Sequence, residues 1–280
     1  MSKIPPKVAT AFHESFYMMR PRLAQLLKIA IETENRGSGQ AILNFDSIHD
    51  QTSLGTNQVK AMRRYAYGAG LLDVQEVPTP FGRAVYKCDP GFSEVATQWL
   101  LHYHMAAPHR SGPGFWGHLT RSALRPGNEL SLNSIENEIN DYLTNSTGQS
   151  LAARTLNTTA SVFLATYHKP DALSGLGILQ AAGDKKFLVN EPEPPGMNVF
   201  AYVLADYWNG VWEGRNGINL NELSEVGGPA SLLLLGSGET NFFLSEMQQA
   251  GLVEVQRKVP PYMAVRLWNN ADQLLERLYD

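Results

Sequence analysis

The sequence predicts a mainly α-helical fold with small β-wings, in the α+β class, and two observations lead to this prediction. A helical pattern followed by a glycine stop and two short strand patterns occurs near both ends of the chain. Between these ends, apolar residues recur at the spacing of amphipathic helices. We therefore expect an N-terminal winged helix-turn-helix over residues 1–91, a helical middle region over residues 92–191 and a C-terminal winged-helix-like region over residues 192–280.

The helix that organises the N-terminal unit is expected to begin near Thr56, a residue type that often caps helices. At about 100° per residue, one face of this helix is small and apolar, through Val59, Met62, Ala66 and Ala69. The opposite face carries amide, cationic and phenolic side chains, namely Asn57, Lys60, Arg64 and Tyr67. No acidic residue occurs between Ser53 and Leu72. This pattern predicts a recognition helix with one face in the core and the other in solvent.

A wing is expected directly after this helix. Gly68 and Gly70 end the helical pattern. Residues 71–77 then alternate as a strand does, two prolines follow, and residues 82–86 fit a return strand. Upstream, Phe45–Gln51 fits the first helix of the helix-turn-helix. Helix, turn, helix and a two-stranded wing is therefore the layout expected for this unit.

Further helical patterns lie before, between and after these segments. They cover Pro21–Glu34, Phe92–Met105, Ile135–Leu143, Ala153–Tyr167, Val199–Trp208 and Glu239–Gln249. Lys185–Val189 fits a short strand, a loop is expected at Gly37–Gly39, and the proline-rich Pro192–Pro195 is the best linker. Trp99 and His102 share one stripe of their helix, which predicts that both belong to the core.

The pattern near the C-terminus repeats the first one. Ala250–Gln256 resembles Ala69–Gln75, and each is followed by Val-Pro and a second strand, here Met263–Trp268. The helix before it carries Glu239 and Glu246 and no cation, whereas the N-terminal recognition helix carries cations and no acid. This difference predicts that the C-terminal unit serves packing or dimerisation rather than DNA reading.

Composition sets the class of protein. The chain has 280 residues and a net charge of -4, which argues against a polycation that coats nucleic acid but allows a local cationic surface. Cys88 is the single cysteine, which excludes a disulfide framework and a cysteine-based zinc site. Residues 1–10 contain no apolar segment of signal-peptide length, and the longest aliphatic run, Leu232–Leu235, is too short to span a membrane. We expect a cytoplasmic protein.

The cations of the recognition helix are the candidates for DNA contact. Lys60, Arg63 and Arg64 suit phosphates, and Asn57 lies near the helix start, where residues that contact base edges usually sit. Tyr67 lies on the same face. The alternative is a solvated face in a winged helix that contacts other proteins.

The histidines give weaker signals. His13 and Glu14 are neighbours in sequence and do not face each other on a helix, and the second histidine of a zinc-protease helix is absent, so residue types favour a structural pair. His102 and His104 are two residues apart, a spacing that diverges on a helix. His109 and His118 lie in or near the following loop. We therefore predict no metal site built from these histidines.

Several of these segments together resemble the successive motifs of one bacterial family. They are Phe12–Phe16, Leu54–Val59 with Arg63–Tyr65 and Gly70–Leu72, Asp89–Pro90, and Ala96–Tyr103. The family is the domain-of-unknown-function family numbered 4007, which is encoded beside DNA phosphorothioation genes. The resemblance is strong over residues 12–105, persists at Val162–Leu164 and Val199–Tyr207, and departs from the family pattern at Asp171–Ile178.

The resemblance implies a role in DNA phosphorothioation. The family is similar to the nicking component of the single-strand (Ssp) phosphorothioation and anti-phage system. We therefore expect a protein that binds duplex DNA and works with other phosphorothioation proteins. We also expect it to nick one strand so that sulfur can be installed. His13 and Glu14 are then the catalytic candidates, because they match a family motif, and Mg²⁺ is the cofactor expected of a nickase. The alternative is a non-catalytic adaptor that positions the sulfur-transfer enzymes on DNA.

A homodimer is also expected. Val199–Trp208 is apolar nearly all round, and one small domain covers only part of such a helix. The C-terminal tail adds an apolar stripe at helical spacing, made of Leu267, Trp268, Leu274, Leu275, Leu278 and Tyr279. Exposed apolar area of this kind usually marks an interface, and a two-fold dimer is the commonest way to bury it. The alternative is that both segments pack on each other within one monomer.

Overall fold

The computed structural model describes residues 5–36, 45–148 and 150–279, so the loop predicted at Gly37–Gly39 lies outside the described residues. The helices are α1 (Arg20–Asn35), α2 (Phe45–Gln51), α3 (Thr56–Gly68), α4 (Pro80–Cys88), α5 (Val95–Ala106), α6 (Gly114–Ser122), α7 (Leu132–Thr147), α8 (Ala153–His168), α9 (Met197–Val211), α10 (Leu220–Ser224), α11 (Pro229–Leu232) and α12 (Ser237–Gln249). Short 3-10 segments are η1 (Ser174–Leu176) and η2 (Ala271–Arg277). The strands are β1 (Glu129–Ser131), β2 (Leu179–Ala181), β3 (Lys186–Val189), β4 (Gly217–Asn219), β5 (Val253–Gln256) and β6 (Met263–Arg266).

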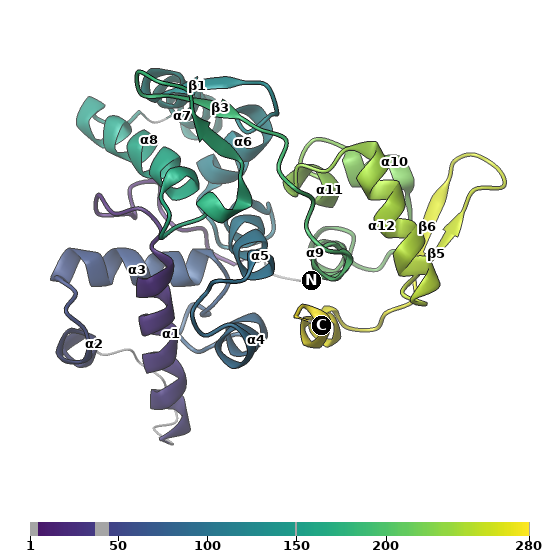
Figure 1. The fold of residues 1–280 in the computed structure, drawn as a ribbon, viewed down its shortest axis with the longest axis horizontal. Coiled ribbons are helices and arrows are strands. Elements are labelled where there is room, and N and C mark those ends of the chain that lie inside the picture. The colour runs from purple at the N-terminus through teal and green to yellow at the C-terminus, as the bar shows by residue number, and fades with distance from the viewer. Residues whose placement is uncertain (1–4, 37–44, 149, 280) are drawn as a thin grey trace.

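The predicted fold class is confirmed, because helices dominate and the strands form small antiparallel sheets. The predicted α2 is reproduced residue for residue, and the helices predicted at Pro21–Glu34 and Ala153–Tyr167 are reproduced to within a residue at each end. The apolar stripe of α1 faces inward, and α1 packs against α3 and α4 (Figure 1). Apolar periodicity therefore identified the helices that bury one face in the core.

The predicted wing of the N-terminal unit is wrong. Residues 71–77 form a turn in which the Asp73 Oδ1 atom accepts from the backbone N–H groups of Gln75 and Val77, at 2.8 and 2.9 Å, and a single bridge joins Leu72 to Pro78. The segment predicted as a return strand belongs to α4. A Thr-Pro pair starts this helix, because the Thr79 hydroxyl accepts from the Gly82 N–H at 3.0 Å.

The middle region holds a small sheet as well as helices. Its strand order is β1-β3-β2, with both pairs antiparallel. The predicted strand at Lys185–Val189 is confirmed as β3, whereas β1 and β2 were not predicted, because each has only three residues. Figure 1 shows β1 and β3 at one end of the molecule beside α7.

The C-terminal unit repeats the order that the sequence indicated. The helix α12 is followed by the β5–β6 hairpin, and β4 completes a second antiparallel sheet of order β4-β6-β5. Figure 1 shows this hairpin projecting from the body of the molecule, at the opposite end of the long axis from α2 and α3. The apolar tail forms the 3-10 segment η2, which packs on α9 and α4.

The helix α9 is the centre of the C-terminal half. All residues from Val199 to Trp208 are buried within the single chain, under α5, α11, α12 and η2. The apolar area on which the homodimer prediction rests is therefore covered inside one monomer, apart from Leu267, which stays exposed. The homodimer remains a prediction without that support. No helix in the described ranges combines the length and the apolar character that a membrane crossing requires.

Replacing a core aromatic residue on α5 should cost much of the free energy of unfolding. Trp99 is 1% exposed, so Trp99→Ala is expected to lower that free energy by about 3–5 kcal/mol. The control is Val95→Ala on the same helix, whose side chain is 49% exposed and whose loss should matter by less than about 0.5 kcal/mol. Chemical denaturation measures both, and equal midpoints for the two variants would refute the core assignment of Trp99.

Candidate nucleic-acid interface

The helix α3 presents the cationic face that the sequence predicted. Val59, Met62 and Ala66 are buried on the opposite side, where α3 packs on α1 and α2. Asn57 and Lys60 are exposed. The helix begins at Thr56, but the cap position belongs to Gly55, which provides no side-chain cap. Packing of the apolar face thus fixes the direction of the polar one.

Carboxylates from other segments meet the two arginines of α3. The Arg63 guanidinium lies 2.5 Å from the Glu76 carboxylate, and that of Arg64 lies 3.1 Å from Glu14. Arg64 also donates to the Phe12 carbonyl at 3.2 Å. In the described part of the chain, Lys60 has no ion-pair partner. Although residues 53–72 contain no acid, the surface around α3 therefore includes carboxylates from other segments.

These groups surround a shallow surface cavity of about 270 Å³. It is lined by Lys60, Arg63, Arg64, Tyr67, Asp73, Val74 and Glu76. The Tyr67 hydroxyl donates to the Pro6 carbonyl at 2.8 Å, which ties the N-terminal segment to this face. The cavity lies where the wing was expected, and its acidic edge comes from the turn that replaces the wing.

His13 is a buried residue whose two ring nitrogens both have partners. Its side chain accepts the Ser15 N–H at Nδ1, over 3.1 Å, and Nε2 lies 2.9 Å from the Thr159 Oγ1 atom. Since that hydroxyl donates to the Thr155 carbonyl at 2.8 Å, it accepts from Nε2–H, and the imidazole is neutral. Burial also lowers the pKa of His13. Its neighbour Glu14 points to Arg64 instead, so the two catalytic candidates do not converge.

His102 belongs to a chain of hydrogen bonds that joins four helices. The Trp116 Nε1–H donates to the Tyr167 hydroxyl at 2.9 Å, and that hydroxyl donates to His102 Nδ1 at 2.7 Å. The remaining nitrogen, Nε2, donates to the Leu232 carbonyl at 2.8 Å. Each group has a fixed direction of donation, so the neutral imidazole is the form that fits. Burial lowers the pKa of His102 to about 4.

A buried ionic network that was not predicted from the sequence joins α5 and the loop after it to α9. Asp206 of α9 is 7% exposed, and it accepts from Tyr103 Oη at 2.8 Å, from His109 Nε2 at 2.9 Å and from the Arg110 guanidinium. Burial, followed by the nearby Arg110 charge, lowers the pKa of His109 to about 3, so its imidazole donates as a neutral group. An acid on an otherwise apolar helix was the one available signal.

The histidines do not assemble a metal site. His104 stacks on Phe81 and lies 3.3 Å from the Tyr202 hydroxyl, away from His102. His118 pairs with Glu138 at 3.0 Å. Over the described ranges, no three side chains of His, Cys, Asp or Glu come together in a way that would hold a metal ion.

The sequence matches a family model over residues 11–260, and the family is described as "Protein of unknown function (DUF4007)". The chain belongs to this family. Among curated proteins, none matches the sequence.

Two crystal structures share the fold of this chain. One is magnesium ion-bound SspB, with a TM-score of 0.77 and 18% identity, covering 100% of this chain and 90% of that one. The other is SspB, with a TM-score of 0.77 and 18% identity, covering 99% and 88%. At this identity the likeness establishes the fold, over nearly the whole length of both chains.

Acidification should destabilise the protein partly through His102. Its pKa falls from 6.5 in the unfolded chain to about 4 in the folded one, so the unfolded state binds more protons between these values. Stability is therefore full above pH 6.5 and decreases as the pH falls towards 4, by about 3 kcal/mol for this group at most.

Urea denaturation of the wild type and of His102→Gln across this pH window tests the assignment. The variant should show a shallower loss of stability on acidification. Val95→Ala, at an exposed position of the same helix and without a titratable group, is the control and should keep the wild-type slope. Identical slopes for all three proteins would contradict the assignment.

Proposed function

We propose that this protein is a cytoplasmic, DNA-binding component of a DNA phosphorothioate modification and anti-phage system. The observation that carries the proposal is the exposed face of α3, where Asn57 and Lys60 lie beside Arg64. Lys60 and Arg64 contact phosphates, and Asn57 contacts base edges. The role in phosphorothioation follows from the family resemblance, and the fold shared with SspB supports it.

The exposure of each ion pair indicates which cations of α3 are available for phosphate contact. The pair of Arg64 with Glu14 is half-exposed, and pairs of this kind contribute little, so DNA phosphate can replace the carboxylate. Arg63 and Glu76 are 28% and 22% exposed, which suits a role in holding the turn after α3. We therefore assign the phosphate contacts to Lys60 and Arg64 first, with Arg63 and Tyr67 at the edge of the interface.

Nicking of one strand is the catalytic form of the proposal, with His13 and Glu14 as its candidates. The buried, neutral and fully paired state of His13 favours the second candidate function, a non-catalytic adaptor. One of the solved SspB structures holds a magnesium ion. Among the residues that the structure describes, no three side chains of His, Cys, Asp or Glu come together as metal ligands.

Removing the exposed cations of α3 should weaken duplex binding and its salt dependence together. For Lys60→Ala with Arg64→Ala, we expect the slope of log K against log salt to flatten by about 0.9 for each lost phosphate contact. The control, Lys169→Ala with Lys186→Ala, removes the same charge from exposed positions outside α3. Fluorescence anisotropy titrations over a salt series measure both. If the α3 variant keeps the affinity and slope of the control, α3 does not contact DNA.

A plasmid assay separates the nickase from the adaptor. The purified protein is incubated with supercoiled plasmid, with Mg²⁺ or with EDTA, alongside His13→Ala and Glu14→Gln. Nicking that depends on Mg²⁺ and is lost in these variants, while their duplex affinity is kept, identifies the nickase. Duplex binding without conversion to open circle identifies the adaptor and removes His13 and Glu14 from the catalytic candidates.

A further inference from the structure

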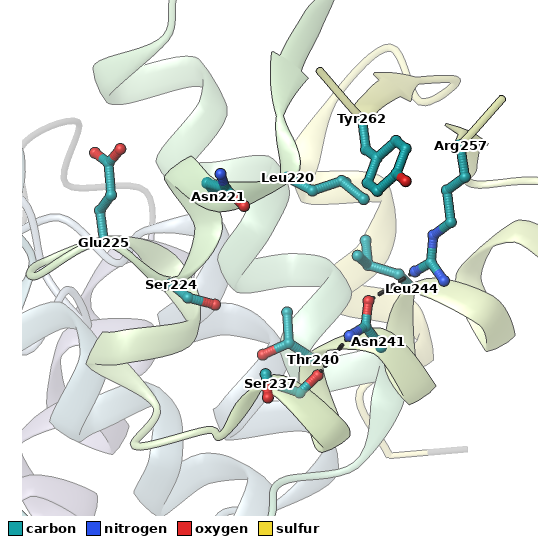
Figure 2. A pocket seen from close by; sticks show the side chains of 10 residues that line it. All are labelled: Leu220, Asn221, Ser224, Glu225, Ser237, Thr240, Asn241, Leu244, Arg257 and Tyr262. Carbon is teal, nitrogen blue, oxygen red and sulfur yellow. Dashed lines mark hydrogen bonds between the residues drawn. The ribbon is translucent and has the colours of Figure 1, made fainter. Parts of the chain in front are cut away.

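A polar groove runs between α10 and α12 and ends at the loop of the β5–β6 hairpin, at the end of the molecule far from α3 (Figures 1 and 2). Its cavity measures about 470 Å³. Its walls include Asn221 and Ser224 of α10, Ser237, Thr240 and Asn241 of α12, and Tyr262 of the hairpin loop. Most of these side chains end in a hydroxyl or an amide, so the groove offers both donors and acceptors.

One stripe of α12 lines this groove through Ser237 and Asn241. Farther along the helix, Ser245 and Gln248 line a smaller adjoining cavity, and Arg257 lines both. Ser237, Asn241, Ser245 and Gln248 are exposed and lie within about 80° of each other on the helix. Glu239 and Glu246, on which the packing or dimerisation role was predicted, lie on the far side, roughly 100° or more from every member of the stripe. The groove-facing side of α12 is therefore neutral and hydrogen-bonding, although the helix as a whole is acidic.

The hairpin adds positive charge to the same groove. The Arg257 Nη2 atom donates to the Asn241 Oδ1 atom at 2.7 Å, and the Asn241 amide donates to the Ser237 carbonyl at 2.8 Å, which holds the guanidinium against α12 (Figure 2). Lys258 follows and is exposed. Glu225 lies at the other end of the cavity from Arg257, and its carboxylate points away from it.

We infer that this groove is a second contact surface for duplex DNA. The α12 stripe meets base edges and sugars, and Arg257 and Lys258 contact phosphates. Short hydroxyl and amide side chains beside two cations match what protein–DNA contacts use. The inference rests on the proposed DNA binding and extends it, because it places a second contact at the opposite end of the chain from α3.

Two neighbouring glutamines provide the test. The Gln248 Oε1 atom accepts from the Val255 N–H at 2.9 Å, a bond that a glutamate keeps, and Gln248 lines the adjoining cavity together with Arg257. Gln249 is also exposed, but it lines neither cavity. Gln248→Glu adds a negative charge beside the phosphate contacts and should weaken binding of a labelled duplex oligonucleotide at least about fivefold. Gln249→Glu adds the same charge outside the groove and should bind as the wild type does.

A second variant tests the hairpin. Arg257→Ala with Lys258→Ala should flatten the slope of log K against log salt by about 0.9 per lost contact, in addition to the effect of the α3 variant. Weaker binding by both groove variants, with Gln249→Glu unchanged, supports the inference. Equal affinity for Gln248→Glu and Gln249→Glu, or an unchanged salt slope for the hairpin variant, overturns it while α3 binding stands. A wild-type protein that binds no duplex overturns the proposed function itself.

Discussion

A buried carboxylate, that of Asp206, holds the two halves of this chain in place. Removing a charged group from water costs several kcal/mol unless it is paired and hydrogen-bonded. Here Tyr103, His109 and Arg110 supply the donors, and all three lie on α5 or directly after it, whereas Asp206 lies on α9. Apolar burial is non-directional, whereas the hydrogen bonds of this carboxylate need donors at defined positions. Polar pairing therefore selects the orientation that apolar burial stabilises.

That orientation decides where the two polar surfaces lie. With α9 fixed against α5, the helices α11 and α12 and the segment η2 pack around it, and η2 also reaches α4 of the N-terminal unit. The hairpin and α3 consequently occupy opposite ends of the long axis (Figure 1). A duplex that touches both would have to follow this axis or bend around it. The hydrogen-bond chain through His102 braces the same centre, because it joins α5, α6, α8 and the end of α11.

The sequence predicted the secondary structure correctly where apolar periodicity alone determines it. Apolar periodicity located α2, α3 and α8, but it failed between Asp73 and Tyr86, where alternation suggested two strands. Local hydrogen bonds from Asp73 and from Thr79 decide that segment. At the candidate site, the cationic face of α3 was predictable, whereas its partners Glu14 and Glu76 were not, because only the tertiary fold brings them near. On α12, the two glutamates predicted a packing role because they make the whole helix acidic. The side chains on one face of the helix, however, decide what that face can bind.

The extended segment Pro192–Pro195 has no regular secondary structure, and the domain boundary was predicted there. It is the natural place at which to split the gene into two coding fragments. Each fragment alone would keep one side of the Asp206–Arg110 pair and lose the other, and α9 would lose its cover from α5. The two fragments should therefore be poorly soluble when made separately and should complement each other when made together. The proline segment thus joins two halves that each supply what the other needs to cover its buried groups.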